Sequence, residues 1–161
     1  MNEAHLHLIV NHFPIVGLFI GIIILAVGIG FKFDNSKRTG LFIIIGSVIA
    51  SYISFETGEG AEEIIEGLPA ISEKLIHEHE EMAEFFMGTQ WMLLLVSLIT
   101  FFLDWKQKKI AHYAYILLLI LSCSSMYFVK KVGTSGGEIT HVEIRENFKL
   151  PAHDSEEDKR D

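Results

Sequence analysis

The stretch Leu68 to Phe86, LPAISEKLIHEHEEMAEFF, has the spacing of an amphipathic helix and carries two histidines two residues apart. At helical spacing, one face is an apolar stripe interrupted by one imidazole, made of Leu68, Ile71, Leu75, His79, Met82 and Phe86. The opposite face is polar and carries Glu73, His77, Glu80, Glu81 and Glu84. We therefore predict that His79 points inward and needs a polar partner, whereas His77 points to solvent.

Long apolar runs lie on both sides of this stretch. The chain has 161 residues, of which 50% are hydrophobic. Four runs are long enough to cross a bilayer core, which needs about 20 residues per helix; they cover roughly residues 13–31, 40–55, 85–105 and 110–129. The sequence thus predicts an all-α integral membrane four-helix bundle over residues 1–150, with a helical loop at about 57–84. Residues 151–161 are predicted to be a disordered acidic tail.

The charges of the loops predict the orientation of the bundle. Four spans place both termini and the 56–84 loop on one side, called side A, and the loops 32–39 and 104–109 on the other, side B. Side B carries six basic and two acidic residues, a net charge of +4, and the remaining seven basic and nineteen acidic residues give side A −12. Because short basic loops resist translocation, side B is predicted to be cytoplasmic and both termini extracytoplasmic. The predicted location is the bacterial inner membrane, with side A facing the periplasm or exterior.

Small residues predict where helices approach one another. Gly17 and Gly21 form one small-residue pair, and Gly46, Ala50 and Ser54 form a ladder in the second span. Such spacing is typical of close helix contacts in membranes.

Two glycine clusters, at residues 58–60 and 133–137, predict helix breaks. The first predicts a tight turn before a short helix at 61–66. The second predicts a turn that brings His141 and Arg145 back over side A.

The histidines are distributed very unequally between the two sides. Only His112 lies on side B, while side A holds His5, His7, His12, His77, His79, His141 and His153. An electron-transfer path across the bilayer through two stacked haems needs a pair of histidines near each face. The single histidine on side B therefore argues against such a path within this chain. It indicates a single site at the side A mouth of the bundle.

Four segments carry a family resemblance: HLIVNHFP, TGEGAEE, HEHEEMA and GTSGGEITHVEIR. Together they resemble a bacterial membrane family defined by a domain of unknown function, with a His-x4-His-Phe-Pro opening and a late Gly-Gly motif. On that match His7 and His12 occupy the opening motif, His79 the middle motif, and Gly136 and Gly137 the late one. The family has proline after the first motif histidine, where this chain has Leu8. The resemblance implies four membrane helices and a link to redox chemistry.

Three functions fit these features. The first is electron transfer through one b-type haem, held by His79 from the third span and His12 or His7 from the first. The second is a non-haem iron, zinc or copper ion, held by ligands drawn from His7, His12, His79, His141, Glu62 and Glu80. The third is a cofactor-free subunit of a membrane complex, whose histidines form a polar network.

The expected partners follow from the same charges. They are the lipid bilayer and either other subunits of a membrane complex or a redox partner on side A. The −12 charge of side A argues against nucleic acid. The chain shows no nucleophile with its base and no phosphate loop, so an electron-transfer or binding subunit is favoured over a stand-alone enzyme.

Overall fold

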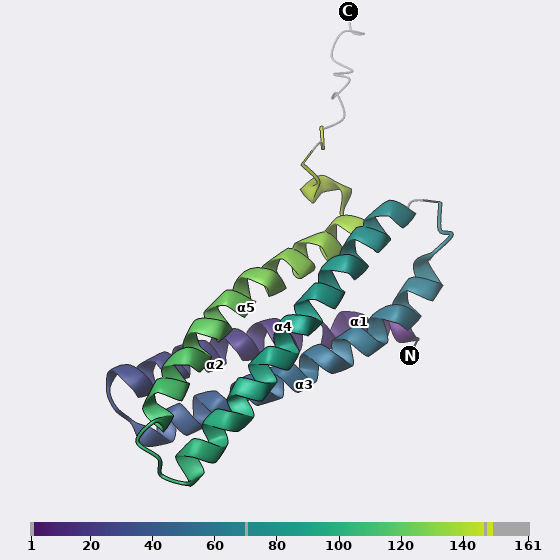
Figure 1. Ribbon diagram of the computed structural model, residues 1–161. Helices are drawn as coiled ribbons and strands as arrows, with labels where there is room; N and C mark the ends of the chain where they lie inside the picture. Colours follow the sequence, from purple (N-terminus) through teal and green to yellow (C-terminus); the bar gives the residue numbers. More distant parts are fainter. Residues whose placement is uncertain (1, 70, 147, 150–161) are drawn as a thin grey trace, which may run out of the picture.

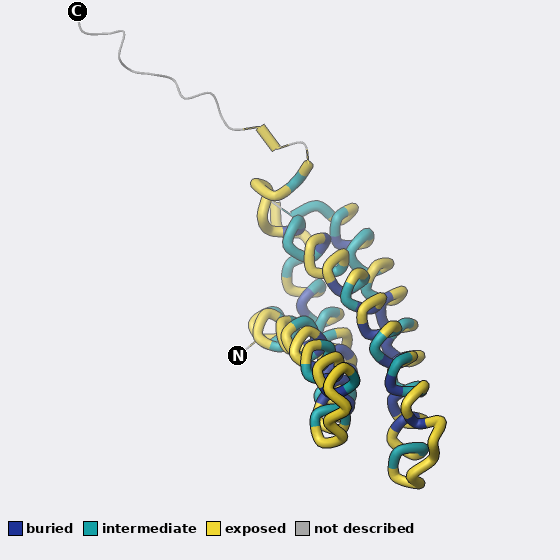
Figure 2. Tube along the Cα trace, turned by 90° about the vertical axis from the view of Figure 1, so that its left-hand side faces the viewer, coloured by how far each residue is buried: buried dark blue, intermediate teal, exposed yellow. Residues whose placement is uncertain are grey.

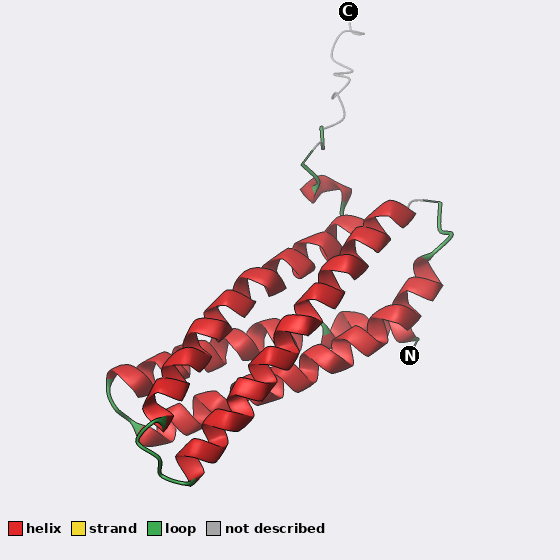
Figure 3. Ribbon diagram, viewed as in Figure 1, coloured by secondary structure: helices red, strands yellow, loops and turns green. Residues whose placement is uncertain are grey.

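The computed structural model describes residues 2–69, 71–146 and 148–149, and helices form its regular structure (Figure 3). The helices are α1 (Glu3–Val10), α2 (His12–Gly30), α3 (Asp34–Ile65), α4 (Glu73–Trp105) and α5 (Ala111–Thr140), followed by a 3-10 turn, η1 (Val142–Ile144). Four helical segments, with α1 and α2 taken together, are long and apolar enough to cross a membrane. The prediction of an all-α chain with four long apolar helices is confirmed, and the predicted tail lies outside the described residues.

The helices form two hairpins that pack side by side. α2 packs most extensively on α3, and α4 on α5, while α3–α4 and α2–α5 contacts join the two hairpins. The α2–α3 and α4–α5 loops lie at one end of the bundle, side B (Figure 1). The start of α1, the end of α3, the start of α4 and the end of α5 lie at the other end, side A (Figure 1).

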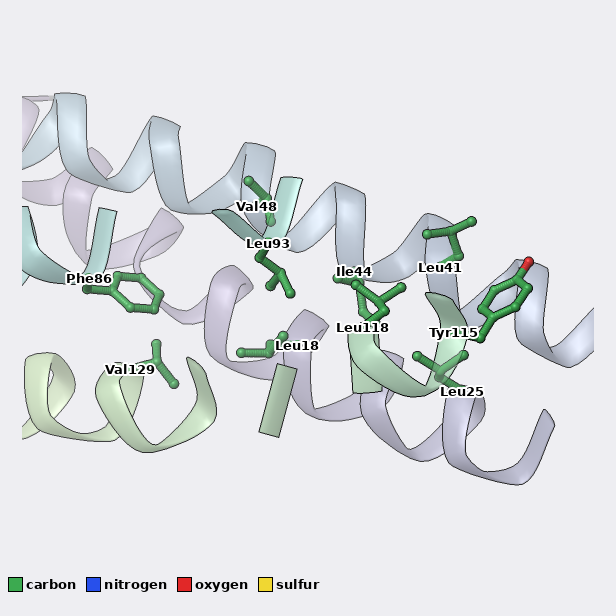
Figure 4. Close-up of a cluster of buried hydrophobic side chains, with 10 residues drawn as sticks. All are labelled: Leu18, Leu25, Leu41, Ile44, Val48, Phe86, Leu93, Tyr115, Leu118 and Val129. Carbon is green, nitrogen blue, oxygen red and sulfur yellow. The ribbon is translucent and has the colours of Figure 1, made fainter. Parts of the chain in front are cut away.

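Buried residues lie on the faces that the helices turn toward one another, and residues on the outer faces are exposed (Figure 2). The central cluster contains Leu18, Leu25, Leu41, Ile44, Val48, Phe86, Leu93, Tyr115, Leu118 and Val129 (Figure 4). It draws on all four long helices, so one apolar core holds both hairpins together.

Glycines let α2 and α3 approach to backbone contact. A Cβ built on Gly21 would lie 2.7 Å from Ile44 Cγ1, and one on Gly17 would lie 3.2 Å from Ser47 Cβ. The predicted contact at Gly17 and Gly21 is confirmed. The predicted ladder from Gly46 is wrong, because Gly46 is exposed and a Cβ there would have nothing within 4 Å. The face of α3 that meets α2 carries Gly40 and Ser47 instead.

Both predicted helix breaks are wrong. α3 continues through Gly58 and Gly60 to Ile65, and the chain then turns at Gly67, whose φ is +81°. α1 packs along this part of α3, so Gly58 and Gly60 give its side chains room.

α5 likewise continues through its glycine cluster to Thr140. There Arg145 binds the last turn, its Nε donating to the Glu138 carbonyl at 2.8 Å and its Nη2 to the Ile139 carbonyl at 3.1 Å. Arg145 therefore caps α5.

α3 and α4 extend well beyond their apolar segments. They contain 32 and 33 residues, which at about 1.5 Å per residue exceeds the roughly 30 Å of a bilayer core. The extra length, at about residues 56–65 and 73–84, is rich in glutamate and lies at side A. The predicted candidate residues gather around these charged ends.

Candidate functional site

Two half-buried histidines, one from each hairpin, form the centre of the side A site. His7 comes from α1, and its Nδ1 lies 3.0 Å from the Ser54 carbonyl and 3.3 Å from Thr57 Oγ1 on α3. A carbonyl can only accept, so the Nδ1 of His7 carries the hydrogen of the neutral ring. Its Nε2 then carries a lone pair, which no donor among the described residues occupies.

His79 on α4 has the equivalent arrangement with α5. Its Nδ1 lies 3.0 Å from Ser135 Oγ, and that hydroxyl donates its own hydrogen to the Val132 carbonyl at 3.0 Å. The hydroxyl hydrogen is therefore already used, so Ser135 accepts from His79 and Nδ1 carries the hydrogen here too. The prediction that His79 faces inward is confirmed, and its Nε2 is also left as a free acceptor.

A glycine of the neighbouring helix makes room for each ring. A Cβ on Gly58 would lie 3.5 Å from His7 Cε1, and one on Gly136 would lie 3.0 Å from His79 Cε1. Each imidazole therefore lies against helix backbone, fixed by a hydrogen bond at one edge. Such fixing of tautomer and orientation is characteristic of histidines that bind metals.

Burial keeps both rings neutral. It lowers the pKa of His7, with the hydrogen bond to Ser54 acting in the opposite direction. It also lowers the pKa of His79, and His7 lies close enough that a charge on it would lower that pKa further. Both imidazoles are therefore uncharged at neutral pH, which is the form that binds a metal.

The other predicted histidines lie outside this pair. His12 is exposed and its Nδ1 lies 3.1 Å from the Leu8 carbonyl of the preceding turn. His141 is exposed at the end of α5, 2.9 Å from Glu143 Oε1. His77 is also exposed, as predicted, with its ring nitrogens 3.6 Å from Glu80 and 3.4 Å from Glu81.

Glu62 and Glu80 face each other between the side A ends of α3 and α4. They line a pocket of about 190 Å³ together with Glu66, Glu73, Ile76 and His77. A hydrogen bond from one carboxyl to the other, helped by partial burial and the Glu80 charge, raises the pKa of Glu62 to about 7. The protonated form of Glu62 is therefore favoured beside the charge of Glu80.

This pair corrects the predicted faces of α4. Glu80, predicted to be fully solvated, is half-buried against Glu62, while Met82, predicted to face inward, is 40% exposed. The inward face runs through Ile76, which is 5% exposed, and His79 to Phe86. Glu80 borders this face beside Glu62, with its side chain still 45% exposed.

We expect the Glu62–Glu80 pair to make the bundle less stable as the pH rises from about 4.5 to about 7. In this window the folded chain keeps a proton on Glu62 that the unfolded chain, with an ordinary pKa of 4.5, has released. Because the site is largely solvated, the loss is about 1 kcal/mol or less. Thermal unfolding in detergent at pH 5 and pH 8 would measure it. Glu62→Gln should remove the dependence and the matched exposed control Glu63→Gln should keep it; equal behaviour of the two would contradict the raised pKa of Glu62.

The sequence did not indicate Ser54, Thr57 and Ser135 as partners of the histidines. Ser54 offers only its backbone carbonyl, so its side chain gave no signal. Thr57 adjoins Gly58, and Ser135 adjoins Gly136. A hydroxyl residue next to a glycine was the available signal, because the pair offers a hydrogen bond and room for a ring.

In the part of the chain that the structure describes, no three histidine, cysteine, aspartate or glutamate side chains are grouped so that they could hold a metal ion. The site thus consists of a histidine pair and, beside it, a separate carboxyl pair. Comparison of the chain with protein-family models, with curated proteins and with solved structures found no significant match.

Proposed function

We propose that the chain is a membrane-embedded electron-transfer protein that binds one b-type haem through His7 and His79. One observation carries the proposal: two neutral imidazoles from different hairpins are both held at Nδ1 and both keep Nε2 free. Gly58 and Gly136 leave the rings the room that a Cβ would fill. These features fit the demands of an axial haem ligand pair.

The number of available ligands favours haem over a bare ion. A haem iron needs only one or two ligands from the protein, because the porphyrin supplies four, whereas a zinc ion takes three or four protein ligands. His7 and His79 are each held by a hydrogen bond to a neighbouring helix. His12 and His141 are exposed, so a bare ion would need one of them or a glutamate to move in. When bound, the haem would supply one-electron redox chemistry. The protein's part is to fix the two rings and keep them uncharged.

The visible spectrum of the detergent-purified protein, oxidised and reduced, tests the proposal. We expect a Soret band with reduced α and β bands, either as isolated or after addition of haem. His7→Ala and His79→Ala should abolish it, while His12→Ala and His141→Ala should leave it intact. A protein that takes up no haem but holds a stoichiometric metal released by His141→Ala would instead support the non-haem site.

The proposed location is the bacterial inner membrane, with the bundle in the lipid bilayer and side A outside the cytoplasm. The length and apolarity of four helical segments support the membrane setting. The +4 charge of the side B loops supports the orientation. The haem would then lie near the outer surface, where a redox partner or another subunit of a membrane complex could reach it. The acidic charge of side A favours a basic partner protein.

The orientation leads to a simple expected result. A reporter that is active only in the cytoplasm should be silent when fused after Asp161, because the C terminus is placed outside. The same reporter inserted into the 104–109 loop of side B should be active. Activity at Asp161 would reverse the orientation and place the histidine pair on the cytoplasmic side.

A further inference from the structure

A second pocket, of about 220 Å³, lies between α3 and α4 at side B, opposite the histidine pair. The charged, aromatic and amide side chains that line it are Arg38, Phe42, Phe101, Asp104, Trp105 and Gln107. The pocket combines a cationic rim with an aromatic wall.

Arg38 gives the rim free hydrogen-bond donors. Its Nε donates to Asp104 Oδ2 at 2.7 Å, and its side chain is 50% exposed while that of Asp104 is 20% exposed. Among the described residues, the guanidinium makes this one hydrogen bond, so both Nη groups remain available as donors. A guanidinium with free Nη groups suits a phosphate, whose oxygens accept paired hydrogen bonds.

A column of aromatic rings forms the wall of the pocket. The rings of Phe42 and Phe101 meet edge to face at 5.8 Å, and Phe101 stacks with Trp105 at 6.4 Å. Phe42 and Trp105 are more than half exposed, so the column presents an open apolar surface. Tryptophan is typical of the membrane–water interface, and the wall continues from it along the apolar segments. An acyl chain fits such a surface.

The surroundings favour a negative head group. Lys106 Nζ lies 4.8 Å from the centre of the Trp105 ring, at the edge of the same pocket. The loops of side B carry +4 in total, which includes the negative charge of Asp104. An anionic lipid is therefore attracted more strongly here than a zwitterionic one.

Gln107 lines the pocket just after the end of α4. Its φ is +50°, a left-handed conformation that favours glycine. Keeping glutamine there costs stability but places an amide at the pocket. Lys32 has the same conformation just after α2, with a φ of +59°, so the conformation marks helix ends at side B, and Gln107 contributes to the pocket through its side-chain amide.

We propose that the side B pocket between α3 and α4 binds one anionic phospholipid, with its phosphate at Arg38 and Gln107 and an acyl chain along Phe42, Phe101 and Trp105. The proposal rests on the membrane setting and not on haem binding. The spectrum and lipid binding are measured separately, so either proposal can fail alone.

Native mass spectrometry of the full chain in neutral detergent tests this, with titration by phosphatidylglycerol and by phosphatidylcholine. We expect one phosphatidylglycerol to bind in preference. The double variant Arg38→Gln/Asp104→Asn, which avoids an unpaired carboxylate, should bind it about fivefold more weakly or worse. Asp104→Asn alone should bind it more tightly, because it leaves the Arg38 charge uncompensated.

The variant Gln107→Gly distinguishes an effect on lipid binding from an effect on stability. It should raise the melting temperature by about 2 °C, because glycine accepts the left-handed conformation, and yet weaken phosphatidylglycerol binding. The matched control is Lys131→Gln, which removes a cation lying 5.0 Å from the Tyr127 ring and outside the pocket; it should bind like the unaltered chain. Equal binding of the two lipids, no effect of the double variant, or equal competition by inorganic phosphate would overturn the proposal.

Discussion

Gly40→Ala is expected to destabilise the bundle by about 3 kcal/mol, the upper end of the usual cost of overpacking. A Cβ at Gly40 would lie 2.7 Å from the Leu25 backbone nitrogen and 2.9 Å from its Cα. Backbone atoms cannot rotate away, so α2 and α3 would have to move apart and loosen the core between them. Unfolding in detergent by heat or by a denaturing detergent would measure the loss.

Gly46→Ala is the matched control, in the same helix and with the same added methyl group. A Cβ there would have nothing within 4 Å, and alanine is the better helix former by up to about 1 kcal/mol. We therefore expect Gly46→Ala to be neutral or slightly stabilising. Equal losses in the two variants would mean that α2 and α3 do not meet at Gly40.

The second large effect is expected at His79. His79→Ala removes the ring that lies against Gly136 and the hydrogen bond to Ser135, both inside the bundle. The expected cost is about 1–3 kcal/mol of unfolding free energy, together with loss of any bound haem. Unfolding in detergent and the visible spectrum report these two consequences separately.

His77→Ala is the natural comparison, two residues away on the same helix. Its ring is exposed and its contacts are carboxylates at 3.4 and 3.6 Å on the surface. Removing it should change the unfolding free energy by about 0.5 kcal/mol or less. If both substitutions were equally harmless, the inward position of His79 would be wrong.

The sequence predicted the long helices because their apolar runs and periodic burial are strong local signals. It failed at the glycines for a physical reason. Glycine ends helices, but it also lets another chain segment lie against a helix, and local sequence does not reveal whether a neighbour is present. Gly67, which has a positive φ, does end the helical region. Gly58 and Gly136 lie within helices, and the rings of His7 and His79 occupy the space that a side chain there would fill.

The candidate site was predictable in part. His79 was assigned an inward position by its spacing, and the structure agrees. The choice between His7 and His12 remained open, because it depends on how α1, which ends at Val10, packs against α3. That packing is a tertiary contact between segments about fifty residues apart, so no local pattern contains it. The approach of Glu80 to Glu62 was missed because the two residues lie on different helices, and no local pattern shows how α3 and α4 pack.

The arrangement of hydrogen bonds also says something about assembly. His7 is oriented by Ser54 and Thr57 within the first hairpin, and His79 by Ser135 within the second. Each hairpin thus holds its own ring through contacts within itself. A ligand that needs both rings binds only the docked form, so its free concentration sets how firmly the hairpins stay together, by RT ln(1 + [L]/Kd). At about one hundred times Kd this linkage contributes about 2.7 kcal/mol, so a haem held as proposed would stabilise the docked hairpins by that amount.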